Sequence, residues 1–103
     1  MSRPFSYNDE NFTVIGNVLF CHIKITHSIG VGDNIIEVPS AIYERLMYHH
    51  NLMYVVGYDY EPYGGNITTT VKFYNGKYYL RTNNRFTSPP YNYLIGYYFL
   101  KDI

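Results

Sequence analysis

Apolar and polar residues alternate most clearly between residue 18 and residue 26. A period of two predicts a β-strand with one face on the core and the other face in solvent. The side chains expected to face the core are Leu19, Cys21, Ile23 and Ile25. Those expected to face solvent are Phe20, His22, Lys24 and Thr26.

The dipeptide Asn75-Gly76 is the strongest local signal in the chain. It favours a two-residue type I′ hairpin turn, because both central positions of that turn need a positive φ. Pairing the flanks across this turn places the apolar residues on one face, namely Val71, Phe73, Tyr78 and Leu80. The opposite face is then expected to carry Thr70, Lys72, Tyr74, Lys77, Tyr79 and Arg81.

The remaining pattern predicts further strands at residues 12–15, 35–38, 51–60 and 91–100, and a short helix at 40–47. Loops are expected at 27–34, 61–66 and 82–90, where Gly, Pro, Asn and Asp gather. Residues 1–11 predict an N-terminal arm, and residues 12–103 a single domain. The strand at 91–100 is apolar on both faces, which predicts either a central position or a subunit contact on one face.

Amino-acid usage favours an all-β fold. The chain has 14 tyrosines and 6 phenylalanines among 103 residues, but Ala41 is its one alanine. Aromatic and β-branched residues suit strands, whereas Ala is the best helix former. Short strands separated by turns predict a single antiparallel, jelly-roll-like β-sandwich of about seven or eight strands with at most one short helix.

Charge and cysteine content narrow the function classes. Eight Lys and Arg balance eight Asp and Glu, so we expect no nucleic-acid partner, because such partners need clustered cations. We expect no membrane insertion, since no apolar segment is long enough to span a bilayer, and no signal peptide at Met1. The lone Cys21 excludes an intrachain disulfide and is expected to be buried.

Catalytic and metal motifs are missing from the sequence. The histidines at 22, 27, 49 and 50 lack the spacing of a metal motif, and no nucleophile motif accompanies them. We therefore expect no catalytic residue, no metal and no cofactor. A less favoured hypothesis is a small hydrolase that uses His49, His50, Asp59 and Glu61.

The surplus of tyrosine needs an explanation. One explanation is that tyrosine simply replaces Phe and Trp in strands. The alternatives are a subunit interface or a ligand-binding surface, because tyrosine combines a large rigid contact area with a polar tip. Stacking on single-stranded nucleic acid is a third alternative, which the neutral charge disfavours. The expected ligand-binding residues lie on loops and on the polar hairpin face: Tyr60, Tyr63, Tyr74, Tyr79, Arg81 and Tyr91.

The succession of residues 12–24, 32–39, 74–80 and 93–100 resembles the small β-sandwich tip, or receptor-binding, domains of bacteriophage tail-fibre, baseplate and other virion proteins. The resemblance covers most of the chain from residue 12 onward, and residues 1–11 carry no coiled-coil or collagen-like pattern of the kind expected in a stem. It implies a homotrimer, made in the host cytoplasm and assembled into a virion, that binds a host-surface glycan or protein.

These observations lead to one main hypothesis. The protein is expected to be a non-enzymatic structural module of a phage or prophage virion that recognises a host-surface carbohydrate through exposed aromatic side chains. The alternative is a viral assembly, decoration or adaptor subunit whose aromatic side chains contact other virion proteins.

Overall fold

The computed structural model of the chain describes residues 5–26, 28–56, 62–82 and 92–101. Within these residues it contains seven strands and one short helix. In chain order they are β1 (Phe12–Ile15), β2 (Val18–Ile25), β3 (Asn34–Val38), α1 (Ser40–Tyr43), β4 (His50–Val56), β5 (Pro62–Tyr74), β6 (Lys77–Thr82) and β7 (Asn92–Phe99).

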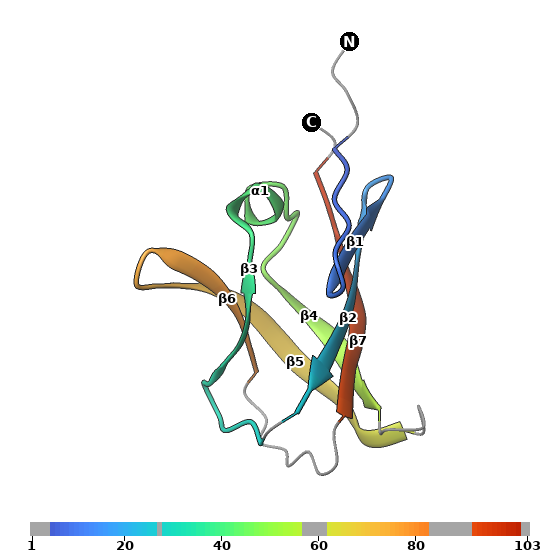
Figure 1. The fold of residues 1–103 in the computed structure, drawn as a ribbon, viewed down its shortest axis with the longest axis vertical. Coiled ribbons are helices and arrows are strands. Elements are labelled where there is room, and N and C mark those ends of the chain that lie inside the picture. Colours follow the sequence, from blue (N-terminus) through green and yellow to red (C-terminus); the bar gives the residue numbers. More distant parts are fainter. Residues whose placement is uncertain (1–4, 27, 57–61, 83–91, 102–103) are drawn as a thin grey trace.

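All seven strands belong to one antiparallel sheet in the order β1-β2-β7-β4-β5-β6-β3. The predicted all-β class with one short helix is therefore confirmed. The two separate sheets of a sandwich are not confirmed, because the hydrogen-bonded ladder runs without interruption from β1 to β3. The sheet curls instead, so that β1, β2 and β7 stand on one side and β6 and β3 on the other, as Figure 1 shows.

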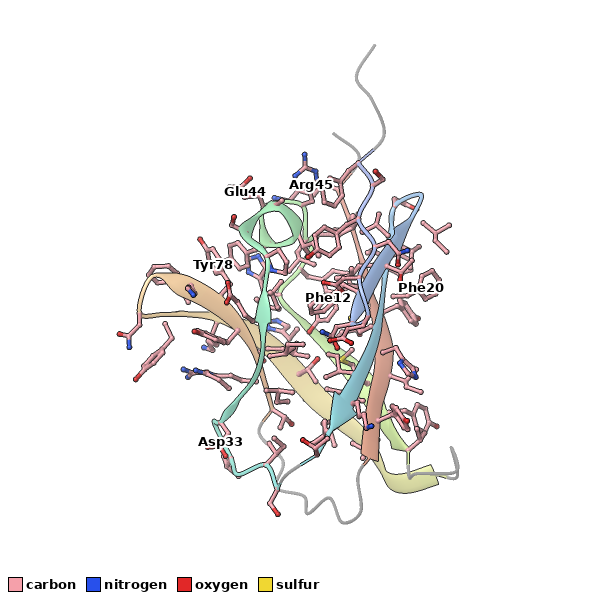
Figure 2. All side chains as sticks on the ribbon, viewed as in Figure 1. Phe12, Phe20, Asp33, Glu44, Arg45 and Tyr78 are labelled. Carbon is pink, nitrogen blue, oxygen red and sulfur yellow. The ribbon has the colours of Figure 1, made fainter. Side chains whose placement is uncertain are left out.

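The core fills the inner face of this curled sheet. The four side chains expected to face the core from β2 are all buried, as predicted. They join one apolar cluster with residues from every strand and from α1. Figure 2 shows Phe12 between the two sides of the sheet and Phe20 pointing away from it. Curling thus gives a single sheet an enclosed core without a second sheet.

Strand β7 is an interior strand of the sheet, between β2 and β4. Leu94 and Tyr98 point to the core, whereas Tyr97 and Phe99 are exposed on the outer face. Gly96 also faces inward, where an added Cβ would lie 2.6 Å from Cγ of Met53. The strand is thus an interior strand with two apolar faces, but the sandwich in which a central position was expected is not confirmed. The predicted alternative of a subunit contact on one face stays a prediction. The close approach of Met53 explains the glycine.

The hairpin of β5 and β6 has the predicted turn and register. Asn75 and Gly76 have φ values of 50° and 82°, as a type I′ turn requires. Phe73 pairs with Tyr78, and Lys72 with Tyr79. The predicted division into an inner apolar face and an outer polar face is confirmed at this hairpin.

The helix is shorter than the expected range of 40–47. Its four residues end at Tyr43, after which the N–H groups of Arg45 and Leu46 donate to carbonyls three residues back rather than four. The chain then bonds to the end of β7. The Met47 N–H donates to the Phe99 carbonyl, and Leu46 forms an isolated bridge with Leu100. The expected length was wrong because the turn after Tyr43 tightens and the chain from Leu46 onward pairs with the end of β7.

The loop expected at 61–66 is also corrected. Residues 62–66 belong to β5, where Gly65 pairs with Val55 and Pro62 pairs with Val56. The register shifts between these two pairs, so β5 has extra residues here, as in a β-bulge. Glycine and proline therefore mark an irregular strand start rather than a loop. The expected strand at 51–60 is described as β4, and residues 57–60 lie outside the described residues.

Candidate binding site on the outer face of the sheet

The predicted ligand-binding residues divide into three groups. Tyr60 and Tyr91 lie outside the described residues. Tyr63 lies on β5, but its side chain is outside the described part. Tyr74, Tyr79 and Arg81 come together on the outer face of the β5–β6 hairpin. We call these three residues the hairpin platform.

The hairpin platform is an aromatic surface with a cation over it. The rings of Tyr74 and Tyr79 meet edge to face, with centroids 6.4 Å apart. The Arg81 guanidinium carbon lies 5.2 Å from the centroid of the Tyr74 ring. Arg81 also donates a hydrogen bond from Nε to Oδ1 of Asn34 at 2.6 Å, which ties it to β3. Tyr74 remains 50% exposed, so about half of its surface is open to a ligand.

Two lysines increase the positive charge around the platform. Lys72 pairs with Tyr79 across the hairpin, and Lys77 pairs with Tyr74. Lys77 lies 3.6 Å from Glu37 of β3, but both side chains are more than half exposed. Such a surface ion pair contributes little to stability and remains open to competition by a ligand. The platform is therefore suited to a ligand that carries negative charge.

On the inner side of the hairpin, aromatic rings attach its tip to α1. Tyr78 stacks on Tyr43 with a centroid distance of 3.7 Å, and Tyr43 stacks on His49 at 4.6 Å. Phe73 contacts Tyr78 at 5.2 Å but is 64% exposed. This stack holds the hairpin at a defined angle and so positions the platform on the opposite side of the same strands.

The described residues do not form a site that would support the hydrolase hypothesis. His49 is part of the ring stack, and His50 begins β4 with an exposed side chain. Asp59 and Glu61 lie outside the described residues. Among the described residues, no three His, Cys, Asp or Glu side chains group as metal ligands would.

Cys21 is buried in β2, as expected. Burial raises the pKa of its thiol to about 12, so the thiol stays protonated at neutral pH. A protonated and inaccessible thiol is a poor nucleophile. Cys21 therefore acts as a core residue.

The outer face carries a second surface that the sequence did not predict. Exposed apolar side chains gather on β2, β7, β4 and the end of β1, and we call this set the apolar outer face. Its members are Ile15, Phe20, Leu52, Tyr54, Tyr97 and Phe99. The apolar residues on both faces of β7 were the one sign of this surface in the sequence. The sequence does not show that β2 and β4 flank β7.

A polar depression lies at one end of the same face. Its volume is about 390 Å³, and it is lined by Glu10, Asn11, His22, Lys24, Thr26 and Tyr93. The rings of His22 and Tyr93 lie 5.0 Å apart on neighbouring strands. None of these residues was predicted as a binding residue, because residues 10 and 11 reach this surface only through the folded path of the N-terminal segment.

A carboxylate fixes that N-terminal segment. The Oδ1 atom of Asp9 accepts hydrogen bonds from the backbone N–H groups of Asn11 and Phe12 at 2.7 and 2.8 Å. Burial acts to raise the pKa of Asp9, but these bonds and one from Tyr7 outweigh burial and lower it. The His22 N–H donates to the Asn11 carbonyl, so the segment is joined to β2. The described part of the predicted arm thus lies against the domain.

Comparison with known proteins identifies no relative. No protein-family model matches the chain, and no curated protein or solved structure matches it. Within the described residues, none of the helical structure is long and apolar enough to cross a membrane.

Proposed function

We propose that this protein is a non-enzymatic binding module that recognises carbohydrate through the hairpin platform. The observation that carries the proposal is the half-exposed Tyr74 ring, which lies beside Tyr79 and under the Arg81 guanidinium. An aromatic ring offers a flat apolar surface to the C–H face of a sugar. The phenol hydroxyls and the guanidinium offer hydrogen bonds to sugar hydroxyl and carboxylate groups.

The charge of the platform points to an acidic sugar. Arg81 carries its charge over the ring, and Lys72 and Lys77 flank it. A guanidinium can bind a carboxylate through two parallel, charge-assisted hydrogen bonds, which are stronger than its bonds to the neutral hydroxyls of a sugar. We therefore expect uronic acids or other carboxylated glycans to bind more tightly than neutral glycans. The virion setting and the bacteriophage resemblance stay predictions, since they rest on the sequence alone.

A glycan array followed by calorimetry tests this proposal. The Tyr74→Ala variant should lose binding to the preferred glycan while its melting temperature stays nearly unchanged, because Tyr74 is half exposed. Phe73→Ala is the matched control, since Phe73 is a neighbouring exposed aromatic on the opposite face of the same strand. Arrays that bind neither neutral nor acidic glycans would overturn the proposal, as would equal losses in both variants.

A second candidate function is supported by the apolar outer face. The predicted alternative was an assembly, decoration or adaptor subunit that binds another protein. Exposed apolar patches rimmed by polar residues are typical of protein–protein contacts. A pull-down that recovers virion proteins with this chain, and fails to recover glycan, would favour this candidate over carbohydrate recognition.

A further inference from the structure

The apolar outer face is continuous across three adjacent strands. Phe20 of β2 pairs directly with Tyr97 of β7, and Tyr54 of β4 pairs with Ile95 of β7. The Tyr97 and Phe99 rings also meet edge to face, with centroids 5.4 Å apart. Directly paired side chains lie on the same face of a sheet and contact each other. The exposed apolar groups therefore form one surface rather than scattered positions.

This surface lacks charge over most of its length. On the outer face of β2, β7 and β4, the one Lys, Arg, Asp or Glu among the described side chains is Lys24, at the end beside Tyr93. The opposite end, around Phe99, carries apolar side chains from β1 and β2. Isolated exposed apolar residues are common on soluble proteins, but a continuous and uncharged patch indicates a contact surface.

The area of the patch suits a modest protein interface. Its four aromatic residues are 39% to 51% exposed. At roughly 200 Å² for each full aromatic side chain, they would contribute about 350 Å². Ile15 and Leu52, which are 65% and 58% exposed, enlarge this area further. A stable interface buries about 800 Å² on each partner, which the patch and its polar rim approach together.

We propose that two copies of this chain pair back to back through their apolar outer faces. Interfaces between identical subunits are more apolar than transient interfaces, and charged residues are depleted at their centres. The patch has both properties. A twofold arrangement places the same surface on both sides, and a formal net charge of zero creates no overall repulsion between the copies. Each sheet then gains a second layer against its outer face.

The pairing leaves the hairpin platform free. Tyr74, Tyr79 and Arg81 lie on β5 and β6, on the side of β4 away from β7. The paired protein would thus present two platforms at once. Two linked sites raise the apparent affinity for a repetitive ligand without any new contact at either site.

Sedimentation velocity and light scattering across a protein concentration series test the proposal. The native chain should approach twice its 12.1 kDa mass. The Phe20→Ser/Tyr97→Ser double variant should raise the dissociation constant by about tenfold or more, because truncated central aromatics dominate such interfaces. Phe73→Ser is the control, since Phe73 is more exposed than either residue but lies on the hairpin.

Footprinting by hydroxyl radicals on the native protein gives an independent test that needs no variant. Oxidation of Phe20 and Tyr97 should fall as the protein concentration rises, while oxidation of Phe73 stays constant. A monomer mass at every concentration would overturn the proposal, and a separate protein would then be the occupant of the face. A mass three times that of the chain would also overturn it and would favour the predicted trimer.

Discussion

The outer face of the sheet has two regions. Both contain exposed aromatic side chains, but different side chains surround them. On β2, β7 and β4, Phe20, Tyr97 and Phe99 lie among apolar groups. On β5 and β6, Tyr74 and Tyr79 lie among charged side chains, namely three cations and the carboxylate of Glu37, which pairs with Tyr79. Both regions therefore contain aromatic rings, but they offer a ligand different surrounding groups. The apolar region suits a dry contact with protein, whereas the hairpin platform suits a polar and negatively charged ligand.

The difference shows that an exposed aromatic side chain does not reveal its role by itself. Tyr97 and Tyr74 are 46% and 50% exposed, so exposure alone does not distinguish them. The cross-strand neighbours do, since Tyr97 pairs with Phe20 and Tyr74 pairs with Lys77. A tyrosine surplus in a sequence therefore predicts a contact surface without indicating which kind.

The largest expected effect is a loss of stability at alkaline pH, and it arises in the core beneath the apolar region. Under the apolar region, burial raises the pKa of Cys21 and the pKa of Tyr98 to about 12. Both groups ionise earlier in the unfolded chain, at about 9 and 10, so their stabilising effect is complete below pH 9 and is lost as the pH rises to 12. Raising the two pKa values by about three and about two units together corresponds to a loss on the order of 7 kcal/mol through this interval, at about 1.4 kcal/mol per unit.

Denaturant unfolding at a series of pH values measures this loss. The Cys21→Ala/Tyr98→Phe double variant should show a clearly shallower decline above pH 9 than the native protein. Parallel pH dependences for the two proteins would show that other groups cause the alkaline destabilisation.

The next largest effect is expected when a lysine is introduced into each region, because self-association should weaken in one variant only. Tyr97→Lys would introduce a cation on β7, the middle strand of the proposed contact, and should weaken self-association by about a hundredfold. Phe73→Lys adds the same charge at the hairpin and should leave self-association unchanged. Sedimentation velocity compares the two variants, and equal behaviour would remove the distinction between the regions for self-association.

The glycine beneath the apolar region should be more sensitive than the glycine of the hairpin turn. In Gly96→Ala, the new Cβ would lie 2.6 Å from Cγ and 3.0 Å from Cβ of Met53, close to the backbone of β4. Because Cβ of Met53 cannot move without shifting β4, and Cγ can move only by a rotamer change of a buried side chain, the substitution should destabilise the fold by about 2 kcal/mol. The measurement is the urea midpoint, and an unchanged midpoint would contradict the packing at Gly96.

The smallest expected effect is at the turn of the hairpin. Gly76 has a φ of 82°, and an added Cβ would meet no atom within 4 Å. Gly76→Ala should therefore destabilise by about 1 kcal/mol through backbone strain alone. Thermal unfolding measures this loss, and glycan binding by the platform should weaken only slightly. A loss as large as that of Gly96→Ala would show that the turn has a packing role.

Local patterns in the sequence were sufficient for β2 and for the hairpin. The alternation of β2 assigns its side chains to two faces, and the Asn75-Gly76 turn fixes the register of β5 against β6. That register alone places Tyr74, Tyr79 and Arg81 on one face. Part of the candidate site could thus be predicted because it lies within one hairpin.

Elements that depend on distant partners were predicted less well. The helix ends at Tyr43 because the turn after it tightens and the chain from Leu46 onward pairs with the end of β7, far away in the sequence. Residues 62–66 extend β5 because β4 offers them a pairing partner. Turn-forming residues and helical periodicity describe local preferences, and hydrogen bonds to distant strands overrode both.

The sequence by itself determined the all-β class, the faces of β2 and the geometry of the β5–β6 hairpin. Those features arise from side-chain alternation and from backbone φ preferences, which act over a few residues. Only the tertiary structure decided the strand order β1-β2-β7-β4-β5-β6-β3. That order places β7, from the end of the chain, between β2 and β4 and so assembles the apolar outer face. Pairing between distant strands is decided by the packing of the whole core, which no local pattern encodes.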